Sequence, residues 1–239
     1  MTSTRNDTIE TPDGQSYDGH VTLPDSGGGP GILLLQEIFG VGDFLLSKAE
    51  DLAEQGYVVL CPDVFWRVER NVALAHDEAA LQTAFGLMGR WSTEVDEATK
   101  AADLAAALDH LRALPEVHGH QVAVMGYCLG GHLAYALACH AQPDACVSYY
   151  GSGIADRLGE AGGLTCPTLF QFGGSDPFIP NDQVDAIRAA LGDREHVTIE
   201  VHADAGHAFE NFLADQFSSP EATAKSWPIT LAFLKEHLR

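Results

Sequence analysis

Short apolar runs alternate along this chain with longer segments whose apolar residues recur at helical spacing. The short runs are typical of strands buried on both faces, and the longer segments are typical of amphipathic helices. The expected strands are 31–36, 57–61, 121–126, 145–150, 167–172 and 197–202. The expected helices are 44–55, 73–89, 94–113, 131–140, 182–191 and 221–238. Because such alternation builds parallel βαβ units, it predicts an α/β fold with a mostly parallel central sheet flanked by helices.

The first residues depart from this alternation. Residues 7–23 place Pro12-Asp13-Gly14 between two stretches of mixed polar and apolar residues, which predicts an N-terminal antiparallel hairpin at the sheet edge. No repeat, low-complexity segment or Pro/Ser-rich linker divides the chain. With 239 residues, of which 46% are hydrophobic, the chain is long enough to bury one core. We therefore predict a single domain over residues 1–239.

Charge and cysteine content narrow the possible partners. Thirty-four acidic against 13 basic side chains give a formal charge of −21, which repels nucleic acid and disfavours an anionic substrate unless arginines lie near it. Neither a signal peptide nor a bilayer-spanning run is apparent, so we expect a soluble, cytoplasmic monomer that binds no membrane. The chain has five cysteines, an odd number, and no two of them have CxxC spacing. This argues against a disulfide framework or a zinc site. We expect no metal.

One strand-to-helix junction has the pattern of a nucleophile elbow. The strand over 121–126 leads into a helix through Gly126-Tyr127-Cys128-Leu129-Gly130. The sharp turn strains the backbone of the nucleophile, and glycines two residues to either side prevent clashes. Backbone N–H groups at the start of the helix favour a thiolate. Taken alone, the pattern fits a packed, unreactive cysteine equally well.

Two later strand ends supply the residues that a cysteine nucleophile needs. Asp176 follows the strand over 167–172, and His207 follows the strand over 197–202. Because parallel strands end at one edge of a sheet, these loops are expected to converge. Asp176 alone is typical of a turn, but the order nucleophile, acid, histidine is the order of this class of site. Together they predict a catalytic triad of Cys128, His207 and Asp176.

Several segments together resemble the dienelactone hydrolase family, and the resemblance covers nearly the whole chain. They are Gln36-Glu37-Ile38-Phe39-Gly40, Cys61-Pro62-Asp63, Gly126 to Gly131, Asp176 and Ala205-Gly206-His207. The resemblance implies the α/β-hydrolase fold, the same triad, and a Glu37 that contacts the thiol at rest and helps to deprotonate it when substrate displaces the carboxylate. In this fold the backbone N–H groups of Ile38 and Leu129 would form the oxyanion hole.

The substrate-binding positions depart from the family pattern. Members that process dienelactone place a serine directly after the catalytic histidine and an arginine four residues after it, whereas this chain has Ala208 and Asn211. A second family arginine has no clear counterpart in residues 73–89. Loop residues beside the catalytic elements usually line the pocket, so we expect substrate contacts from Phe39, Trp66, Phe178, Ala208 and Asn211. Arg67 and Arg90 are candidates to offset the acidic field near an anionic ligand.

These observations predict a hydrolase that cleaves a small ester or lactone through a thiol ester, without a cofactor. The family example is the conversion of carboxymethylenebutenolide to maleylacetate. A thiolate suits such substrates because their leaving groups need little protonation. Two alternatives stay open: a noncatalytic relative that binds a small ligand, and a redox-sensing thiol protein, because activated thiolates also oxidise readily.

Overall fold

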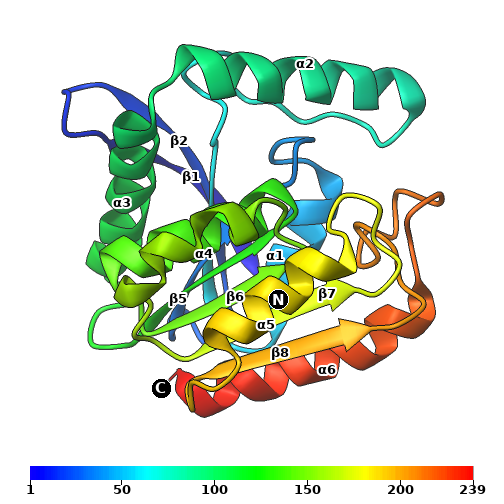
Figure 1. Ribbon diagram of the computed structural model, residues 1–239. Helices are drawn as coiled ribbons and strands as arrows, with labels where there is room; N and C mark the ends of the chain where they lie inside the picture. Colours follow the sequence, from blue (N-terminus) through cyan, green and yellow to red (C-terminus); the bar gives the residue numbers. More distant parts are fainter. Residues whose placement is uncertain (239) are drawn as a thin grey trace. The chain divides into compact units, whose positions relative to one another are not determined.

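The computed structural model describes residues 1–238. The chain folds as two compact units, Met1–Val122 and the residues from Ala123 onward. Strands and the helices that connect them make up each unit (Figure 1). The prediction that the whole chain is a single domain stays a prediction.

The first unit begins with the predicted hairpin. Strand β1 (Ser3–Glu10) pairs antiparallel with β2 (Ser16–Leu23), and β2 pairs antiparallel with β4 (Val58–Pro62). Strand β3 (Gly31–Leu35) then pairs parallel with β4, as a βαβ unit requires. Helices α1 (Asp43–Glu54), α2 (Glu78–Glu94) and α3 (Glu97–Ala113) complete the unit. The antiparallel edge hairpin is confirmed, and its first strand begins at Ser3 rather than at residue 7.

Helix α2 lies further along the chain than the predicted helix over 73–89. It begins at Glu78 because Asp77 caps it: the Asp77 carboxylate accepts a hydrogen bond from the Ala80 N–H. Residues before the cap are irregular, and Ala73 forms an isolated antiparallel bridge with Gly40. The apolar spacing indicated a helix, but the capping carboxylate decided where it starts.

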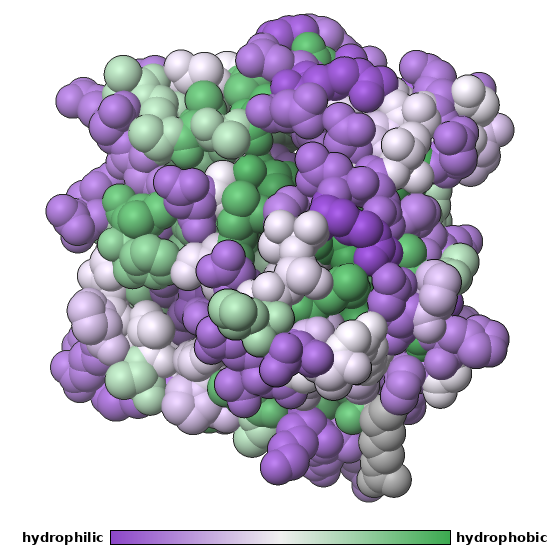
Figure 2. Space-filling view, turned by 180° about the vertical axis from the view of Figure 1, so that it is seen from behind, coloured by the Kyte–Doolittle hydropathy of each residue, from purple (hydrophilic) through white to green (hydrophobic). Residues whose placement is uncertain are grey.

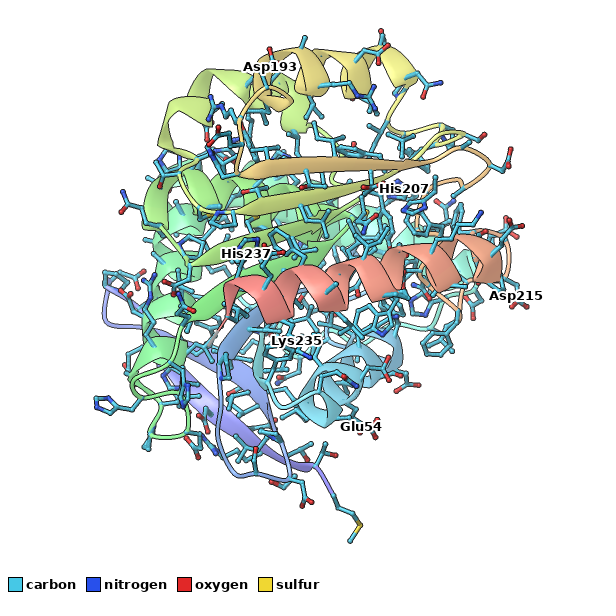
Figure 3. All side chains as sticks on the ribbon, turned by 90° about the horizontal axis from the view of Figure 1, so that it is seen from below. Glu54, Asp193, His207, Asp215, Lys235 and His237 are labelled. Atoms are coloured by element: carbon cyan, nitrogen blue, oxygen red, sulfur yellow. The ribbon has the colours of Figure 1, made fainter. Side chains whose placement is uncertain are left out.

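The second unit contains the parallel strands that carry the candidate triad. Strand β5 (Val122–Tyr127), whose first residue closes the first unit, is followed by β6 (Ala145–Tyr149), β7 (Thr168–Gly173) and β8 (Val197–His202), paired in that order and all parallel. The helices are α4 (Leu129–Ala141), α5 (Asn181–Leu191) and α6 (Pro220–His237), with a 3₁₀ segment, η1 (Ile154–Gly163). Figure 3 shows α5 and α6 on opposite sides of β7 and β8. The predicted parallel arrangement with flanking helices is confirmed here.

One face of the protein carries mostly polar side chains. The face in Figure 2 is mostly hydrophilic, with apolar patches between the polar residues. Within residues 1–238, no helix combines the length and apolar character needed to cross a bilayer. The cytoplasmic location and the monomeric state stay predictions.

The turn between β5 and α4 depends on glycine at position 126. A Cβ built on Gly126 would overlap the backbone of Gly130, which cannot move without unwinding the first turn of α4. We expect Gly126→Ala to lower the free energy of unfolding by about 3 kcal/mol or more, measured by urea denaturation.

A matched control is available on helix α2. A Cβ added to Gly86 meets nothing within 4 Å, so Gly86→Ala should raise the free energy of unfolding by about 0.5–1 kcal/mol through helix propensity. If both alanine variants changed stability equally, the close approach at Gly126 would not limit the fold.

Candidate active site

Cys128 occupies a strained turn between β5 and α4. Its backbone has φ 54° and ψ −114°, a conformation that non-glycine residues rarely adopt. The Cys128 N–H donates to the Tyr149 carbonyl at 3.0 Å, which holds the turn against the end of β6. The thiol therefore sits at the N-terminus of α4, beyond the carboxyl end of β5. Backbone strain of this kind persists where surrounding contacts enforce it, and it is concentrated at functional sites.

His207 connects Cys128 to Asp176. The His207 Nε2 atom lies 3.0 Å from the Cys128 Sγ, and the His207 Nδ1 atom lies 2.7 Å from the Asp176 Oδ2. The side chains of His207 and Asp176 are 9% and 0% exposed. Figure 3 shows His207 beside the carboxyl-terminal ends of the strands of this unit. The three residues that were predicted to converge from separate loops are thus in a continuous chain of contacts.

The Asp176 carboxylate is held by the turn that follows it. Its Oδ1 atom accepts hydrogen bonds from the N–H groups of Phe178 and Ile179, at 2.8 and 3.2 Å. The other oxygen is therefore directed at the imidazole. This arrangement fixes the His207 ring with Nδ1 facing the acid and Nε2 facing the thiol, which is the orientation a general base needs.

The electrostatic surroundings favour a protonated imidazole. Burial lowers the pKa of His207, but negative charge at Cys128 and the hydrogen bonds to Asp176 and Cys128 outweigh burial and raise the pKa to about 10. The folded-state pKa thus exceeds the unfolded value of about 6.5. Protonated His207 consequently stabilises the fold fully below about pH 6.5, and this contribution is lost as the pH rises toward 10.

Aromatic rings surround the imidazole, and one of them was missed by sequence reasoning. Tyr150 follows β6 with φ 37°, and its ring centroid lies 5.3 Å from that of His207. The Phe178 ring, predicted to contact substrate, lies 5.0 Å from the imidazole in an edge-on arrangement. The only signal in the sequence was position, because Tyr150 directly follows its strand as Cys128 does. No motif around Tyr150 indicated a role in chemistry.

In the first unit, Glu37 faces a histidine that the sequence analysis did not consider. Glu37 is 3% exposed, and its Oε2 lies 3.9 Å from the Nε2 of His76. Burial lowers the pKa of His76, against a smaller opposite effect of Asp43. The His76 ring lies 4.2 Å from the ring of Phe39, and the neighbouring Ile38 is buried. The Glu37 Oε2 and His76 Nε2 atoms thus lie close together but beyond hydrogen-bond distance.

Trp66 and Arg67 form a buried cluster with Asp103 in the first unit. The Asp103 carboxylate accepts two hydrogen bonds from the Arg67 guanidinium, both at 2.7 Å, and one from the Trp66 indole at 3.1 Å. Arg67 also pairs with Asp13 at 3.0 Å and lies over the Trp66 ring. These contacts give Trp66 and Arg67 a structural role. The geometry therefore does not support the substrate contacts that were expected from these two residues.

A substitution can distinguish a structural role of Arg67 from a role in substrate binding. Because the side chains of Arg67 and Asp103 are only 14% and 11% exposed, Arg67→Ala would leave a buried carboxylate unpaired. We expect the free energy of unfolding to fall by about 3 kcal/mol, while kcat/KM for esters stays within about twofold of wild type.

Arg70 provides the control for this prediction. It lies over the same Trp66 ring but is exposed and donates to the Ser16 carbonyl, so Arg70→Ala should change stability by no more than about 0.5 kcal/mol. A raised KM in Arg67→Ala, without lost stability, would instead indicate substrate binding.

Ala208 and Asn211 lie in the loop after His207. Ala208 has φ 54°, and its carbonyl accepts the Asn211 N–H. Asn211 is fully buried, and its side-chain oxygen accepts the Leu213 N–H at 3.0 Å. This side chain therefore shapes the loop that carries His207. Among residues 1–238, no three His, Cys, Asp or Glu side chains gather as a metal site would require.

Comparisons with known proteins agree with this geometry. The profile of the dienelactone hydrolase family matches residues 17–238. Carboxymethylenebutenolidase from Pseudomonas sp. is 35% identical over 228 residues, covering 95% of this chain and 93% of the relative. The Pseudomonas putida enzyme of that name is 35% identical over 201 residues, covering 82% and 83%. A dienelactone hydrolase-like promiscuous phosphotriesterase from metagenomic libraries superposes with TM-score 0.82 at 25% identity, covering 100% and 99%. The predicted α/β-hydrolase fold is confirmed.

Proposed function

Since the chain belongs to the dienelactone hydrolase family, we propose that this hydrolase cleaves a small ester or lactone with Cys128 as its nucleophile. The observation that supports this most is the line of contacts from the Cys128 Sγ through both His207 nitrogens to Asp176, at 3.0 and 2.7 Å. Dienelactone-type cleavage, as the names of the carboxymethylenebutenolidase relatives indicate, is the family example of this reaction.

The first half of the reaction forms a thiol ester. The Cys128 thiolate attacks the ester carbonyl, and the N–H group of Leu129, the residue after the nucleophile, stabilises the oxyanion, as is general for this fold. The carbon–oxygen bond of the ester then breaks, and the leaving oxygen takes the proton from the His207 imidazolium. The raised pKa of His207 keeps that proton available at neutral pH.

The second half uses His207 as a base. Once Cys128 is acylated its negative charge is gone, so the largest influence that raises the pKa of His207 disappears. The neutral imidazole takes a proton from water, the hydroxide attacks the thiol ester, and the Cys128 thiolate leaves. Asp176 keeps Nδ1 protonated throughout.

Intact-mass spectrometry after brief mixing with 4-nitrophenyl acetate tests this proposal. We expect one acetyl group per chain, released on a longer incubation and absent from Cys128→Ala, with a burst of nitrophenol of matching size. Acetylation that persists in Cys128→Ala would overturn the cysteine mechanism. A stable, reducible adduct with peroxide and no acetylation would support the redox-thiol alternative instead.

A further inference from the structure

An exposed aromatic ring lies against the imidazole used in the proposed mechanism. Phe178 is 47% exposed, and its ring meets that of His207 edge-on, at an interplanar angle of 68°. Single exposed hydrophobic residues are common on protein surfaces. The position of Phe178 is distinctive because one side of the ring contacts the group that exchanges protons with the substrate.

The backbone around Phe178 is held rigidly. Its N–H donates to the Asp176 Oδ1 at 2.8 Å, and the next residue, Ile179, is 1% exposed. The Ser152 hydroxyl approaches the Phe178 carbonyl at 3.5 Å. The same carboxylate therefore orients the imidazole and the segment that presents the ring. The backbone that presents the ring therefore has little conformational entropy to lose when a ligand packs on it.

The charges near the imidazole oppose a negatively charged substrate. A thiolate at Cys128 and an imidazolium at His207 compensate each other, and the buried Asp176 carboxylate leaves this group with a net charge of about −1. The whole chain adds a formal charge of −21. A substrate carboxylate would need a nearby cation to overcome this field.

The arginines that could supply such a cation are already engaged. All eight arginines within residues 1–238 donate to acceptors of their own unit. Six pair with carboxylates, and Arg70 and Arg194 donate to backbone carbonyls. The family's arginine position after the histidine holds the buried Asn211. Figure 3 places Lys235 toward the far end of α6 from His207.

We propose that the enzyme selects uncharged esters that carry an aromatic or similar apolar group, and that Phe178 contacts this group. This inference rests on the proposed function and specifies its substrate class. Packing a flat apolar group on the open face of Phe178 removes both surfaces from water, whereas a carboxylate placed there would lose hydration without gaining a partner. Specificity thus differs from that of relatives that bind carboxylate-bearing lactones.

Three acetate esters test the proposal, because all of them transfer the same acetyl group and differ only in the leaving group. Phenyl acetate carries the apolar group, 3-acetoxybenzoate adds a carboxylate to the same ring, and vinyl acetate lacks the ring. For wild type we expect kcat/KM for phenyl acetate to exceed that for 3-acetoxybenzoate by about tenfold or more, in low salt. The difference should appear mainly in KM.

Two substitutions at the ring and one control complete the test. Phe178→Ala should lower kcat/KM for phenyl acetate about tenfold more than for vinyl acetate, the value of one aromatic contact. Phe178→Arg should improve 3-acetoxybenzoate relative to phenyl acetate, because it places a cation beside the imidazole. Phe85→Ala, which removes a 40% exposed ring from α2, should leave kcat/KM for all three esters unchanged.

The outcomes separate this inference from the proposed function. Equal losses for phenyl and vinyl acetate in Phe178→Ala, or a wild-type preference for 3-acetoxybenzoate, would overturn the substrate class while acylation of Cys128 still supports the mechanism. Turnover of all three esters without acylation of Cys128 would overturn the mechanism itself.

Discussion

Replacing Cys128 with alanine will lower kcat/KM for aryl esters by at least about 10⁴-fold, because the variant has no atom that can form the acyl intermediate. The remaining side chains can only orient water. The variant also lacks the thiol that lies 3.0 Å from the His207 Nε2 atom. The measurement is steady-state hydrolysis of phenyl acetate, with thermal denaturation to show that the variant is folded.

Two further cysteine variants are controls for this loss. Cys128→Ser retains a nucleophilic atom and should keep a small part of the activity, with the burst slowed rather than removed. Cys166→Ala removes a thiol that is 8% exposed and lies before β7, and it should retain wild-type kinetics. Comparable losses in Cys128→Ala and Cys166→Ala would assign the effect to packing and contradict the nucleophile.

The second large effect is expected from Asp176→Asn, an almost isosteric change. The Phe178 and Ile179 N–H groups donate to Oδ1, so the oxygen of the new amide must stay there. The amide NH₂ then occupies the Oδ2 position, 2.7 Å from the Nδ1 of His207. Because an NH₂ cannot accept, Nδ1 must lose its proton and the imidazole carries its hydrogen on Nε2. That tautomer cannot take a proton from water or from the thiol.

We therefore expect Asp176→Asn to lower kcat by about 10⁴-fold with little loss of stability. It should also reduce alkylation of Cys128 by iodoacetamide at neutral pH, because the hydrogen bond and charge of Asp176 help to raise the pKa of His207. Asp182→Asn, on the exposed first turn of α5, is the matched control. Wild-type alkylation combined with slow turnover would show that Asp176 acts only after acylation.

The strand ends that carry Cys128, Asp176 and His207 could be predicted because they depend on local sequence. Glycines around Cys128 indicate a sharp turn, and Asp176 and His207 follow apolar runs whose length and composition predict strands. Parallel strands end at one edge, so order along the chain translates into proximity. The distances of 3.0 and 2.7 Å at His207 agree with that reasoning.

The role of Arg67 could not be predicted in the same way. Its partner Asp103 lies 36 positions away along the chain, on a helix whose own pattern says nothing about the loop after β4. An arginine beside a tryptophan is consistent with ligand binding or with a buried ion pair. Only the packing of α3 against the first strands distinguishes them, and it favours the ion pair.

The sequence itself determined the elbow at Cys128, the hairpin, and the order of Cys128, Asp176 and His207 along the chain. Turns, helix starts and buried strands are set by residues close together along the chain. The tertiary structure decided the rest. It placed the rings of Tyr150 and Phe178 beside His207. It also directed the Asn211 side chain at the Leu213 N–H and placed His76 beside Glu37. Such contacts join residues from separate segments, and their geometry depends on how whole elements pack. The positions of the candidate triad could thus be predicted from the chain, whereas the packing of side chains around His207 could not.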